Sequence, residues 1–413
     1  MLFPLFLYDA AMALYRAGIW LAVPRNRKAR SFYNGRKMLL QRIGLAMECD
    51  TRARIWVHCA SLGEFEQGRP VIEALKQQFP QYSVVLTFFS PSGYEASKDY
   101  AHADHIFYLP IDTAANAHDF VAAVKPVCAL FVKYEFWYHC LKELHARKIP
   151  AILFSAVFQQ RHPFFKWYGS LYRQMLQWYA QIFVQDEHSL KLLAALNPRL
   201  PVQLGGDTRF DRAAKVLASN KSFDNVALFK GNKQLLVAGS TWQDDEMLLQ
   251  SAFEHLTADY KMLVAPHNVN QDNIDRLLAL WPHSACLWNA DAATLQSCNI
   301  AIVHSMGQLA SLYKYADVVW VGGGFTRSGI HNAIEPAVFG KPIFFGPEYS
   351  RYVEAQALVQ HRAAAPCKDA EEFLTALKNE TALRKMGSNA AGYVQSQIGG
   401  TAKIIAYLSA NTF

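Results

Sequence analysis

Short apolar segments alternate with segments of helical periodicity over most of the chain from residue 54 onward. In the first half the apolar segments are residues 55–59, 83–88, 105–108, 129–132, 151–154 and 181–185. Helical periodicity lies between and after them, at residues 68–79, 92–100, 115–124, 136–147, 164–178 and 189–195. This alternation is typical of βα units and predicts a doubly wound parallel sheet.

A second cycle of the same kind follows a run of glycine and polar residues at 204–212. Its apolar segments are residues 234–238, 261–265, 285–287, 300–303, 318–322 and 342–345, and a last helical stretch at 371–408 is long enough for two helices. We therefore predict an α/β protein with two Rossmann-like domains. The expected parts are an N-terminal helix at 1–23, domains at 24–205 and 206–387, and a C-terminal helix at 388–413, for which packing back on the first domain is one arrangement.

The N-terminal stretch at residues 2–23 is mostly apolar and has roughly the 20 residues that a membrane-spanning helix needs. Asp9 and Arg16 interrupt it on one helical face, and a charge at mid-bilayer costs about 2.5–3.5 kcal/mol. These charges favour a shallow, interfacial helix, and a buried helix of a soluble core is the alternative. No basic segment precedes the apolar run, which disfavours a cleaved signal peptide.

A cluster of basic residues follows this stretch. Its members are Arg25, Arg27, Lys28, Arg30, Arg36 and Lys37. Such a cluster places the following chain on the cytoplasmic side of a membrane and can bind acidic lipid headgroups. If the helix lies in or on a membrane, we therefore expect the protein at the cytoplasmic face of that membrane, in contact with membrane lipid.

Composition narrows the function classes. The 413 residues are 52% hydrophobic, enough for two full cores, and the formal charge of +7 suits an anionic ligand or an anionic membrane face. No zinc-like cysteine spacing and no aromatic RNA-binding motif is present, so we expect no nucleic-acid partner. The seven cysteines lack a framework spacing and predict free or buried thiols in a reducing compartment.

The turn after the first predicted strand holds the clearest candidate for chemistry. Ser61 stands where a helix N-cap is expected, and Glu64 three residues later completes a capping-box pattern. Glu64 is therefore either a helix cap or a functional carboxylate. Chemistry in open α/β sheets lies beyond the carboxyl ends of the strands, where a carboxylate can take a proton from a hydroxyl nucleophile.

The second half places small or polar residues after successive strands. These turns are Gly239-Ser-Thr-Trp242, Ala265-Pro-His-Asn268, Ser305-Met-Gly-Gln-Leu309, Gly322-Gly-Gly-Phe325 and Gly329-Ile-His-Asn-Ala-Ile-Glu-Pro336. Each alone is an ordinary turn, but together on one sheet edge they favour a phosphate-bearing ligand near helix N-termini. None matches a Walker A loop or the dinucleotide G-x-G-x-x-G spacing, so NAD is disfavoured.

Three polar side chains belong to this candidate ligand site. Glu335 follows Asn332 by three residues on one helical face, where the pair either caps the helix or binds ribose hydroxyls. Arg209 can form bidentate contacts with a phosphate, and a solvated linker residue is its alternative. No Asp-x-Asp motif for a divalent metal is present, so we expect neither metal nor cofactor.

The ordered set of motifs resembles the 3-deoxy-D-manno-oct-2-ulosonic acid (Kdo) transferases, the glycosyltransferase family 30 enzymes of lipopolysaccharide assembly. The resemblance covers nearly the whole chain. It rests on Ser61-Leu-Gly-Glu64 after Trp56-Val-His, residues 87–93, Tyr134-Glu-Phe-Trp137, Gly239-Ser-Thr-Trp, Ser305-Met-Gly-Gln-Leu, Val321-Gly-Gly-Gly-Phe, His331-Asn-Ala-Ile-Glu-Pro and Gly340-Lys-Pro.

This resemblance implies a GT-B fold and a single inverting transfer of Kdo from CMP-Kdo to a lipid A precursor of the lipid IVA type, without a metal. It makes Glu64 the general base, with Gly63 beside the reacting centre. On the acceptor side we expect Glu135, Arg36 and Ser61. Around the donor we expect Arg209, Ser240, Thr241, His267, Met306, Gly307, Asn332 and Glu335.

Four positions depart from the family pattern. Where this chain has His267, Gln308, Arg209 and Lys133, the family often has Arg, Glu, Lys and Glu, respectively. We therefore expect the detailed contacts with CMP and with the acceptor to differ from those of the family. The alternatives to Kdo transfer are a GT-B transferase or epimerase that uses a UDP-sugar, and a non-catalytic lipid-binding protein at the inner membrane.

Overall fold

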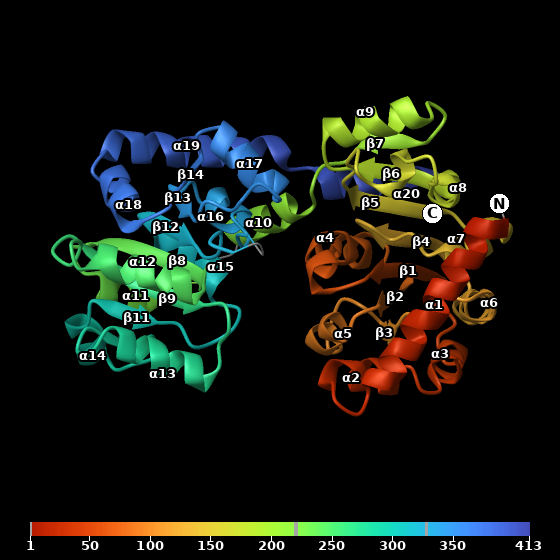
Figure 1. Cartoon of the computed structure of the whole chain (residues 1–413), viewed down its shortest axis with the longest axis horizontal. Helices are drawn as coiled ribbons and strands as arrows, with labels where there is room; N and C mark the ends of the chain where they lie inside the picture. The colour runs from red at the N-terminus through yellow and green to blue at the C-terminus, as the bar shows by residue number, and fades with distance from the viewer. Residues whose placement is uncertain (1, 219–221, 327–328) are drawn as a thin grey trace. The chain divides into compact units, whose positions relative to one another are not determined.

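Two compact units make up the chain in the computed structural model, which describes residues 2–218, 222–326 and 329–413. The first unit comprises Met1–Asp211 with Gly399–Phe413, and the second comprises Arg212–Ile398. Each has its own seven-stranded parallel sheet (Figure 1), so the predicted pair of α/β domains is confirmed. The chain leaves the first unit after Asp211 and returns at Gly399, compared with the expected boundaries at 205/206 and 387/388.

The sheet of the first unit has the strand order β3-β2-β1-β4-β5-β6-β7. Its strands are β1 Arg54–Cys59, β2 Ser83–Phe88, β3 His105–Tyr108, β4 Pro126–Val132, β5 Ala151–Ala156, β6 Tyr179–Val184 and β7 Val202–Leu204. Strands β2 and β3 extend the sheet on one side of β1, and β4 begins the other side. Ile55 accordingly pairs with Val84 on one side and Cys128 on the other. The loops after β1 and β4 therefore diverge at a topological switch point, where doubly wound sheets hold ligands.

Helices cover both faces of this sheet. They are α1 Leu2–Ala22, α2 Arg27–Gly35, α3 Leu39–Glu48, α4 Leu62–Gln78, α5 Pro91–Ser97, α6 Ala114–Val124, α7 Tyr138–Ala146, α8 Ser170–Gln177, α9 Glu187–Leu196 and the returning α20 Gly400–Asn411. Trp56 packs with Leu141 in one apolar cluster, whereas Val57 belongs with Val71 and Ile404 to the other. Burial on both faces explains why the strands are apolar at nearly every position.

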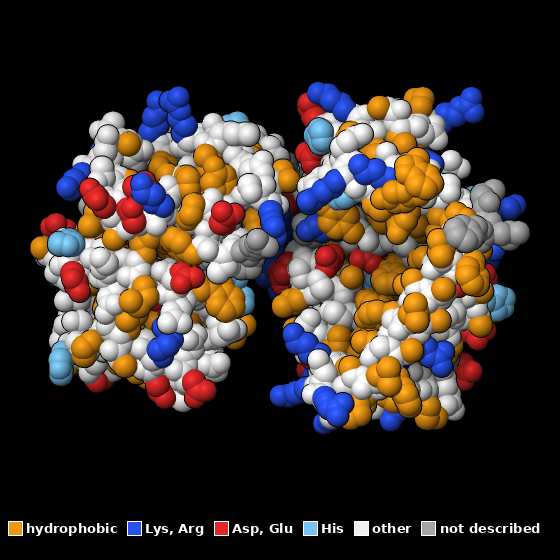
Figure 2. Space-filling model, in the orientation of Figure 1, with side chains coloured by type: hydrophobic (Ala, Val, Ile, Leu, Met, Phe, Trp, Pro, Cys, Tyr) orange, Lys and Arg blue, Asp and Glu red, His pale blue; other side chains and the backbone are white. Residues whose placement is uncertain are grey.

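Helix α1 lies on the surface of the first unit. Phe6, Leu14 and Trp20 are 66%, 74% and 61% exposed, which excludes a buried core helix. Figure 2 shows hydrophobic side chains spread over α1 and basic side chains near α2. By length and composition, no single helix among the described residues could cross a bilayer, but Pro4–Ala22 and Arg27–Gly35, bent by 119°, pass together as a pair.

Polar contacts hold the first half of α1 on the unit. The Tyr8 hydroxyl donates to Asp112 Oδ2 at 2.5 Å, and Asp9 Oδ1 lies 2.7 Å from His139 Nε2. Asp112 also accepts from the backbone N–H groups of His139 and Cys140 at 2.9 Å. Asp9, which interrupts the apolar run in the sequence, therefore pairs with a histidine of α7.

The sheet of the second unit has the order β10-β11-β9-β8-β12-β13-β14, which reverses between β8 and β12. Its strands are β8 Gln234–Thr241, β9 Tyr260–Pro266, β10 Ala285–Leu287, β11 Ile300–Ile302, β12 Val318–Val321, β13 Ile343–Phe345 and β14 Ala364–Pro366. Its helices are α10 Arg209–Ala218, which crosses the boundary, α11 Asp224–Lys230, α12 Gln243–Phe253, α13 Gln271–Leu280, α14 Ala292–Ser297, α15 Leu309–Leu312, α16 Ile334–Val338, α17 Val353–Gln360, α18 Ala370–Leu377 and α19 Glu380–Gln397.

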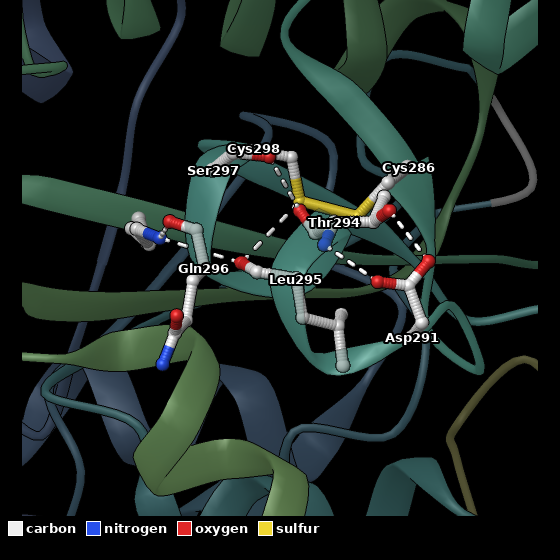
Figure 3. Close-up of a disulfide and its surroundings, with 8 residues drawn as sticks. Cys286, Asp291, Thr294, Leu295, Gln296, Ser297 and Cys298 are labelled. Atoms are coloured by element: carbon white, nitrogen blue, oxygen red, sulfur yellow. Dashed lines mark hydrogen bonds between the residues drawn. A yellow bond between two sulfur atoms is a disulfide. The ribbon is translucent and has the colours of Figure 1, made fainter.

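Two of the seven cysteines form a disulfide. It joins Cys286 in β10 to Cys298, the residue that ends α14, and Figure 3 shows both beside the Asp291 cap of that helix. The prediction of free thiols is therefore wrong for this pair and correct for the other five, of which four are buried and Cys49 is exposed. The pair could not be predicted because its proximity depends on how α14 packs beside the sheet edge.

Three local predictions differ from the structure. Strands β7 and β14 are absent from the prediction because they are incompletely buried edge strands, so their residues do not form a bulky apolar run. The predicted helix at 164–178 starts as a 3₁₀ turn, Pro163–Phe165, and becomes α8 only at Ser170, with Trp167 91% exposed between them. The final stretch forms three helices rather than two, because Asn379 caps α19 and Gly399, at φ 116°, begins α20.

Replacing Asp211 with alanine is expected to loosen α20. Asp211 Oδ1 accepts from the Gly399 N–H at 2.7 Å, and Oδ2 accepts from the Thr401 N–H at 2.7 Å and its hydroxyl at 2.8 Å. Loss of this buried acceptor should cost about 1–3 kcal/mol. Hydrogen exchange of the α20 amides should therefore accelerate, whereas Asp272→Ala, an exposed change on α13, should leave it unaltered. Unchanged protection of α20 in Asp211→Ala would contradict this role.

Candidate active site

The turn between β1 and α4 presents Ser61, Gly63 and Glu64 at the carboxyl edge of the first sheet. Ser61 Oγ accepts from the Gly63 N–H at 3.2 Å, so the predicted N-cap is confirmed. The same hydroxyl donates to the Glu64 carboxylate, which is a variation on the capping box. Glu64 is only partly buried. One of its oxygens is thus held in place while the side chain stays accessible to a substrate.

A buried polar network lies beside this turn. His58 Nδ1 is 2.8 Å from Thr87 Oγ1, which also accepts from Trp56 Nε1 at 2.8 Å. His58 Nε2 is 3.1 Å from Glu135 Oε2, the oxygen to which Trp137 Nε1 donates. The network joins β1, β2 and the loop after β4, and therefore fixes the two loops of the switch point relative to each other.

The carboxylate of Glu135 is enclosed by this network and is 3% exposed. It lies near Glu64, because both carboxylates, after the larger effect of burial, raise the pKa of the Cys59 thiol. Cys59 therefore stays protonated and unreactive. A direct contact between Glu135 and an acceptor stays a prediction, since in this conformation the carboxylate orients its own loop.

Arg36 is half-buried against aromatic rings. Its guanidinium carbon lies 3.6 Å from the centroid of Phe32 and 4.8 Å from that of Tyr108. It donates to the carbonyl of Leu109 at 2.9 Å and to that of Phe89 at 2.7 Å, and burial lowers its pKa to about 9. Arg36 thus ties together the carboxyl ends of β2 and β3, and its predicted contact with the acceptor remains untested.

A groove of about 1190 Å³ runs between α1, the α2–α3 segment and the loop that precedes α6. Met12, Ala17 and Trp20 contribute apolar surface from α1, and Arg36 and Lys37 contribute charge. The groove opens at the carboxyl edge of the first sheet, beyond β3. It offers a mixed apolar and cationic surface within the first unit.

The switch point of the second unit brings the loops after β8 and β12 into close backbone contact. The Gly322 N–H donates to the Gly239 carbonyl at 2.8 Å, and a Cβ added to Gly322 would lie 2.1 Å from the Ser240 carbonyl oxygen. Ser240 has a positive φ of 55°. The Thr241 hydroxyl is buried and donates a hydrogen bond to Glu246 at 2.9 Å. The predicted contact of Thr241 with the donor substrate can therefore use only its backbone.

Three rings stack on this edge of the second sheet. The centroid of His267 is 4.5 Å from Trp242 and 4.4 Å from His331. Trp242 Nε1 donates to His331 Nε2 at 2.7 Å, which requires that nitrogen to be unprotonated. Burial, followed by the neighbouring His267, lowers the pKa of His331 to about 4, and burial also lowers the pKa of His267. The stack is therefore neutral at physiological pH.

The start of α16 places the next pair of predicted donor residues together. Asn332 Nδ2 donates to Glu335 Oε1 at 3.1 Å, and Asn332 Oδ1 accepts from the Ile334 N–H at 3.1 Å. The charge of Glu335 opposes the effect of burial, which lowers the pKa of Arg212. This geometry caps the first turn of α16 and is compatible with both the capping and the ligand-binding interpretations.

The other residues that are predicted to bind the donor substrate lie in the turn before α15 and at the start of α10. Met306 is 82% exposed and precedes Gly307, whose φ is 80°, in the turn before α15. Arg209 belongs to the first unit and donates to Asp207 Oδ2 from Nε at 2.9 Å and from Nη2 at 2.6 Å. An incoming phosphate would have to share that guanidinium with Asp207.

The two units thus carry separate groups of predicted residues. Ser61, Gly63 and Glu64 share one turn, and the buried network brings Glu135 near them. Sequence reasoning missed His58 and Trp242, whose only signal was a polar or aromatic residue at the end of an apolar strand. Among the described residues, no cluster of three or more His, Cys, Asp or Glu side chains could hold a metal ion.

Solved structures of GT-B-like proteins, which also have two α/β units, match the fold of this chain. UDP-GlcNAc 2-epimerase from Neisseria meningitidis, bound to UDP-GlcNAc, has a TM-score of 0.61 at 15% identity, covering 87% of this chain and 100% of that one. MurG from Acinetobacter baumannii has a TM-score of 0.55 at 15% identity, covering 87% and 99%. Identity this low shows the fold alone, so the fold is GT-B-like.

Sequence comparisons identify the family. A family model for 3-deoxy-D-manno-octulosonic-acid transferase (kdotransferase) matches residues 37–212. The 3-deoxy-D-manno-octulosonic acid transferase of Haemophilus influenzae is 26% identical over 377 residues, 87% of each chain. That of Chlamydia muridarum is 27% identical over 338 residues, 79% of this chain and 77% of the relative. These comparisons support the Kdo transferase family for this chain.

We expect an NMR titration to find His331 neutral down to pH about 4, its pKa in this structure. His267→Gln should raise that pKa by removing a neighbouring positive charge, whereas His283→Gln, at an exposed site, should leave it unchanged. Between pH 6.5 and about 4 the unfolded state binds more protons, so the second unit should lose stability as pH falls through this window. Titration of His331 near 6.5 would contradict this stacked arrangement of the three rings.

Proposed function

We propose that the protein transfers Kdo from CMP-Kdo to a lipid A precursor in lipopolysaccharide synthesis. Similarity to the Kdo transferase family supports the donor and the reaction class. The observation that carries the proposal is the position of Glu64, a partly exposed carboxylate at the carboxyl end of a central strand. The family model also covers this position.

In this proposal Glu64 is the general base. Ser61 donates to one carboxylate oxygen and fixes the side chain, and the other oxygen removes the proton from an acceptor hydroxyl. That hydroxyl attacks the anomeric carbon of Kdo while the bond to the CMP phosphate breaks, in one inverting step. Gly63, which precedes Glu64 in the same turn, would lie beside the reacting centre.

The second unit would bind CMP at its carboxyl edge. The proposed contacts are Arg209 from the linker with Ser240, Thr241, His267, Met306, Gly307, Asn332 and Glu335. Thr241 would contribute through its backbone, because its hydroxyl is occupied by Glu246. Backbone N–H groups at the helix starts and basic side chains would stabilise the charge on the leaving phosphate without a metal ion.

The acceptor would bind to the first unit. Ser61 and Glu64 would contact the reacting hydroxyl, and Glu135 would hold the loop after β4 through His58. Arg36 would form part of the wall of the groove beside α1. A lipid A precursor of the lipid IVA type is the proposed acceptor, because it combines a polar sugar with apolar chains that suit this mixed surface.

We also propose that α1 attaches the protein to the cytoplasmic face of the inner membrane. Leu14 and Leu21 are 74% and 66% exposed, and the basic residues at 25–37 follow directly. Exposed apolar side chains beside a basic cluster are the features of an interfacial helix on an anionic leaflet.

Use of a UDP-sugar is the second candidate, because a UDP-GlcNAc 2-epimerase has a similar fold. Incubation with a lipid A precursor and either CMP-Kdo or a panel of UDP-sugars, followed by mass analysis, discriminates between the two and counts the sugars added. Turnover of a UDP-sugar alone would overturn Kdo transfer. Binding of lipid without any turnover would instead support the non-catalytic alternative.

Glu64→Gln is expected to lower the rate of Kdo transfer by about 10²–10⁴-fold, because it removes the proton acceptor and keeps the size of the side chain. Its affinity for CMP, measured by calorimetry, should stay close to that of the unmodified protein. Glu95→Gln, an exposed change on α5, serves as the matched control. Full activity of Glu64→Gln would remove the general-base role.

Leu14→Glu together with Leu21→Glu should weaken binding to vesicles that contain anionic phospholipid. Burying a leucine side chain contributes about 1.5–3 kcal/mol, so each change should lower the partition coefficient by about tenfold or more. Met247→Glu, on α12, changes a residue of similar exposure, 52%, and should have no effect on co-sedimentation. Equal binding by the double variant and this control would argue against attachment through α1.

A further inference from the structure

Three side chains near Glu64 have no part in the mechanism above. Lys133 and Tyr134 follow β4, and Arg161 lies in the loop after β5. Because β4 pairs in parallel with both β1 and β5, the loops after these three strands meet at the same edge of the sheet. Lys133 and Arg161 therefore lie on the edge that carries Glu64.

Lys133 has an unusual backbone conformation. Its φ is 72°, in the left-handed region that non-glycine residues rarely adopt, and its N–H donates to the Phe154 carbonyl at 2.9 Å. Its Nζ lies 5.6 Å from the centroid of the Tyr134 ring. Backbone strain of this kind concentrates at functional sites, where it directs a side chain. Here it directs the ammonium group of Lys133 alongside an exposed tyrosine.

A tight turn places Arg161 next to His162, whose ring contacts Tyr134. The His162 N–H donates to the Gln159 carbonyl at 2.8 Å, and His162 Nδ1 accepts from the Gln159 N–H at 3.2 Å. The His162 ring packs edge-on against Tyr134, with 5.6 Å between centroids. Arg161 is exposed within this turn. Two loops therefore present one cation each around a shared aromatic ring that is 42% exposed.

The charge of Glu64 also acts on the pKa of Tyr134. After the larger effect of burial, Arg161 lowers the pKa of Tyr134, while Asp186 and Glu64 raise it. The Asp186 carboxylate is already engaged as the cap of α9, where it accepts from the Ser189 N–H at 2.7 Å. Among the described residues, neither Lys133 nor Arg161 has a carboxylate within ion-pair distance.

We propose that Lys133 and Arg161 form an anion subsite that binds a phosphate monoester of the acceptor, next to the hydroxyl that Glu64 deprotonates. The Tyr134 hydroxyl would donate to the same group. Two unpaired cations of different geometry, one a point charge and one a planar fork, suit the oxygens of a phosphate. This subsite rests on the proposed function and adds a specificity determinant to its acceptor side.

The test combines enzyme variants with two acceptors. A lipid A precursor that carries phosphate monoesters is compared with the same lipid after phosphatase treatment. The dissociation constant of each is measured in detergent micelles without CMP-Kdo, so that the comparison needs no turnover. Lys133→Gln and Arg161→Gln should each weaken binding of the phosphorylated lipid by about tenfold, and change binding of the dephosphorylated lipid by less than about twofold.

Two matched controls come from the opposite edge of the same sheet. Lys125 also has a positive φ, 47°, and precedes β4 as Lys133 follows it. Arg199 is exposed in the turn before β7. Lys125→Gln and Arg199→Gln should leave the affinity for both lipids unchanged. The KM for CMP-Kdo should also be unchanged in all four variants.

Equal losses for both lipids would overturn the subsite, because the cations would then act without regard to phosphate. A raised KM for CMP-Kdo in Lys133→Gln or Arg161→Gln would also overturn it, since it would assign the cations to an anionic group of the donor. If the unmodified protein transfers no Kdo from CMP-Kdo, the proposed function fails instead, and the binding comparison still decides the subsite.

Discussion

Burial of both faces of each parallel sheet is the constraint on which the rest of the structure depends. Strands that are covered by helices on both sides can carry few polar side chains, so the accessible chemistry is confined to the loops at their carboxyl ends. The order of strands then selects which loops matter. The reversals between β1 and β4, and between β8 and β12, open the two edges where nearly all candidate residues lie.

At each reversal of strand order, some polar side chains are buried and hold the loops in place, whereas others are accessible to a ligand. In the first unit His58 and Glu135 are buried and hold two loops together, whereas Ser61 and Glu64 stand at the accessible turn. In the second unit the Thr241 hydroxyl is occupied internally, while the neighbouring rings and backbone remain near the surface. Residues of one motif can therefore have quite different roles.

The sequence was sufficient for features that depend on local pattern. The alternation of strands and helices, the two domains and the Ser61 cap follow from periodicity and from residues within one turn. Features that depend on packing could not be derived in this way. The contact of His58 with Thr87 and Glu135 joins two strands and the loop after β4, and the packing of Arg36 against aromatic rings depends on how α2 lies against the sheet.

Local backbone conformation was a further feature that the sequence could not predict. The positive φ of Lys133 and Ser240 has no signature in residue type, since neither is a glycine, and both stand at strand ends of interest. The aromatic stretch after Pro163 has helical spacing but forms a 3₁₀ turn that leaves Trp167 exposed, because Arg173 donates to the carbonyls of Phe164 and Lys166 at 3.0 and 2.8 Å.

The carboxylate of Asp112 links the first helix to the interior of its unit. It accepts from the Tyr8 hydroxyl and from the first backbone amides of α7, the helix that follows the Glu135 loop. Removing residues 1–8 would remove Tyr8, so that Asp112 would lose one of its hydrogen-bond donors. This loss would destabilise the beginning of α7. A preparation trimmed in this way would consequently lose a contact within the first unit, and any fall in turnover could not be assigned to the proposed membrane attachment alone.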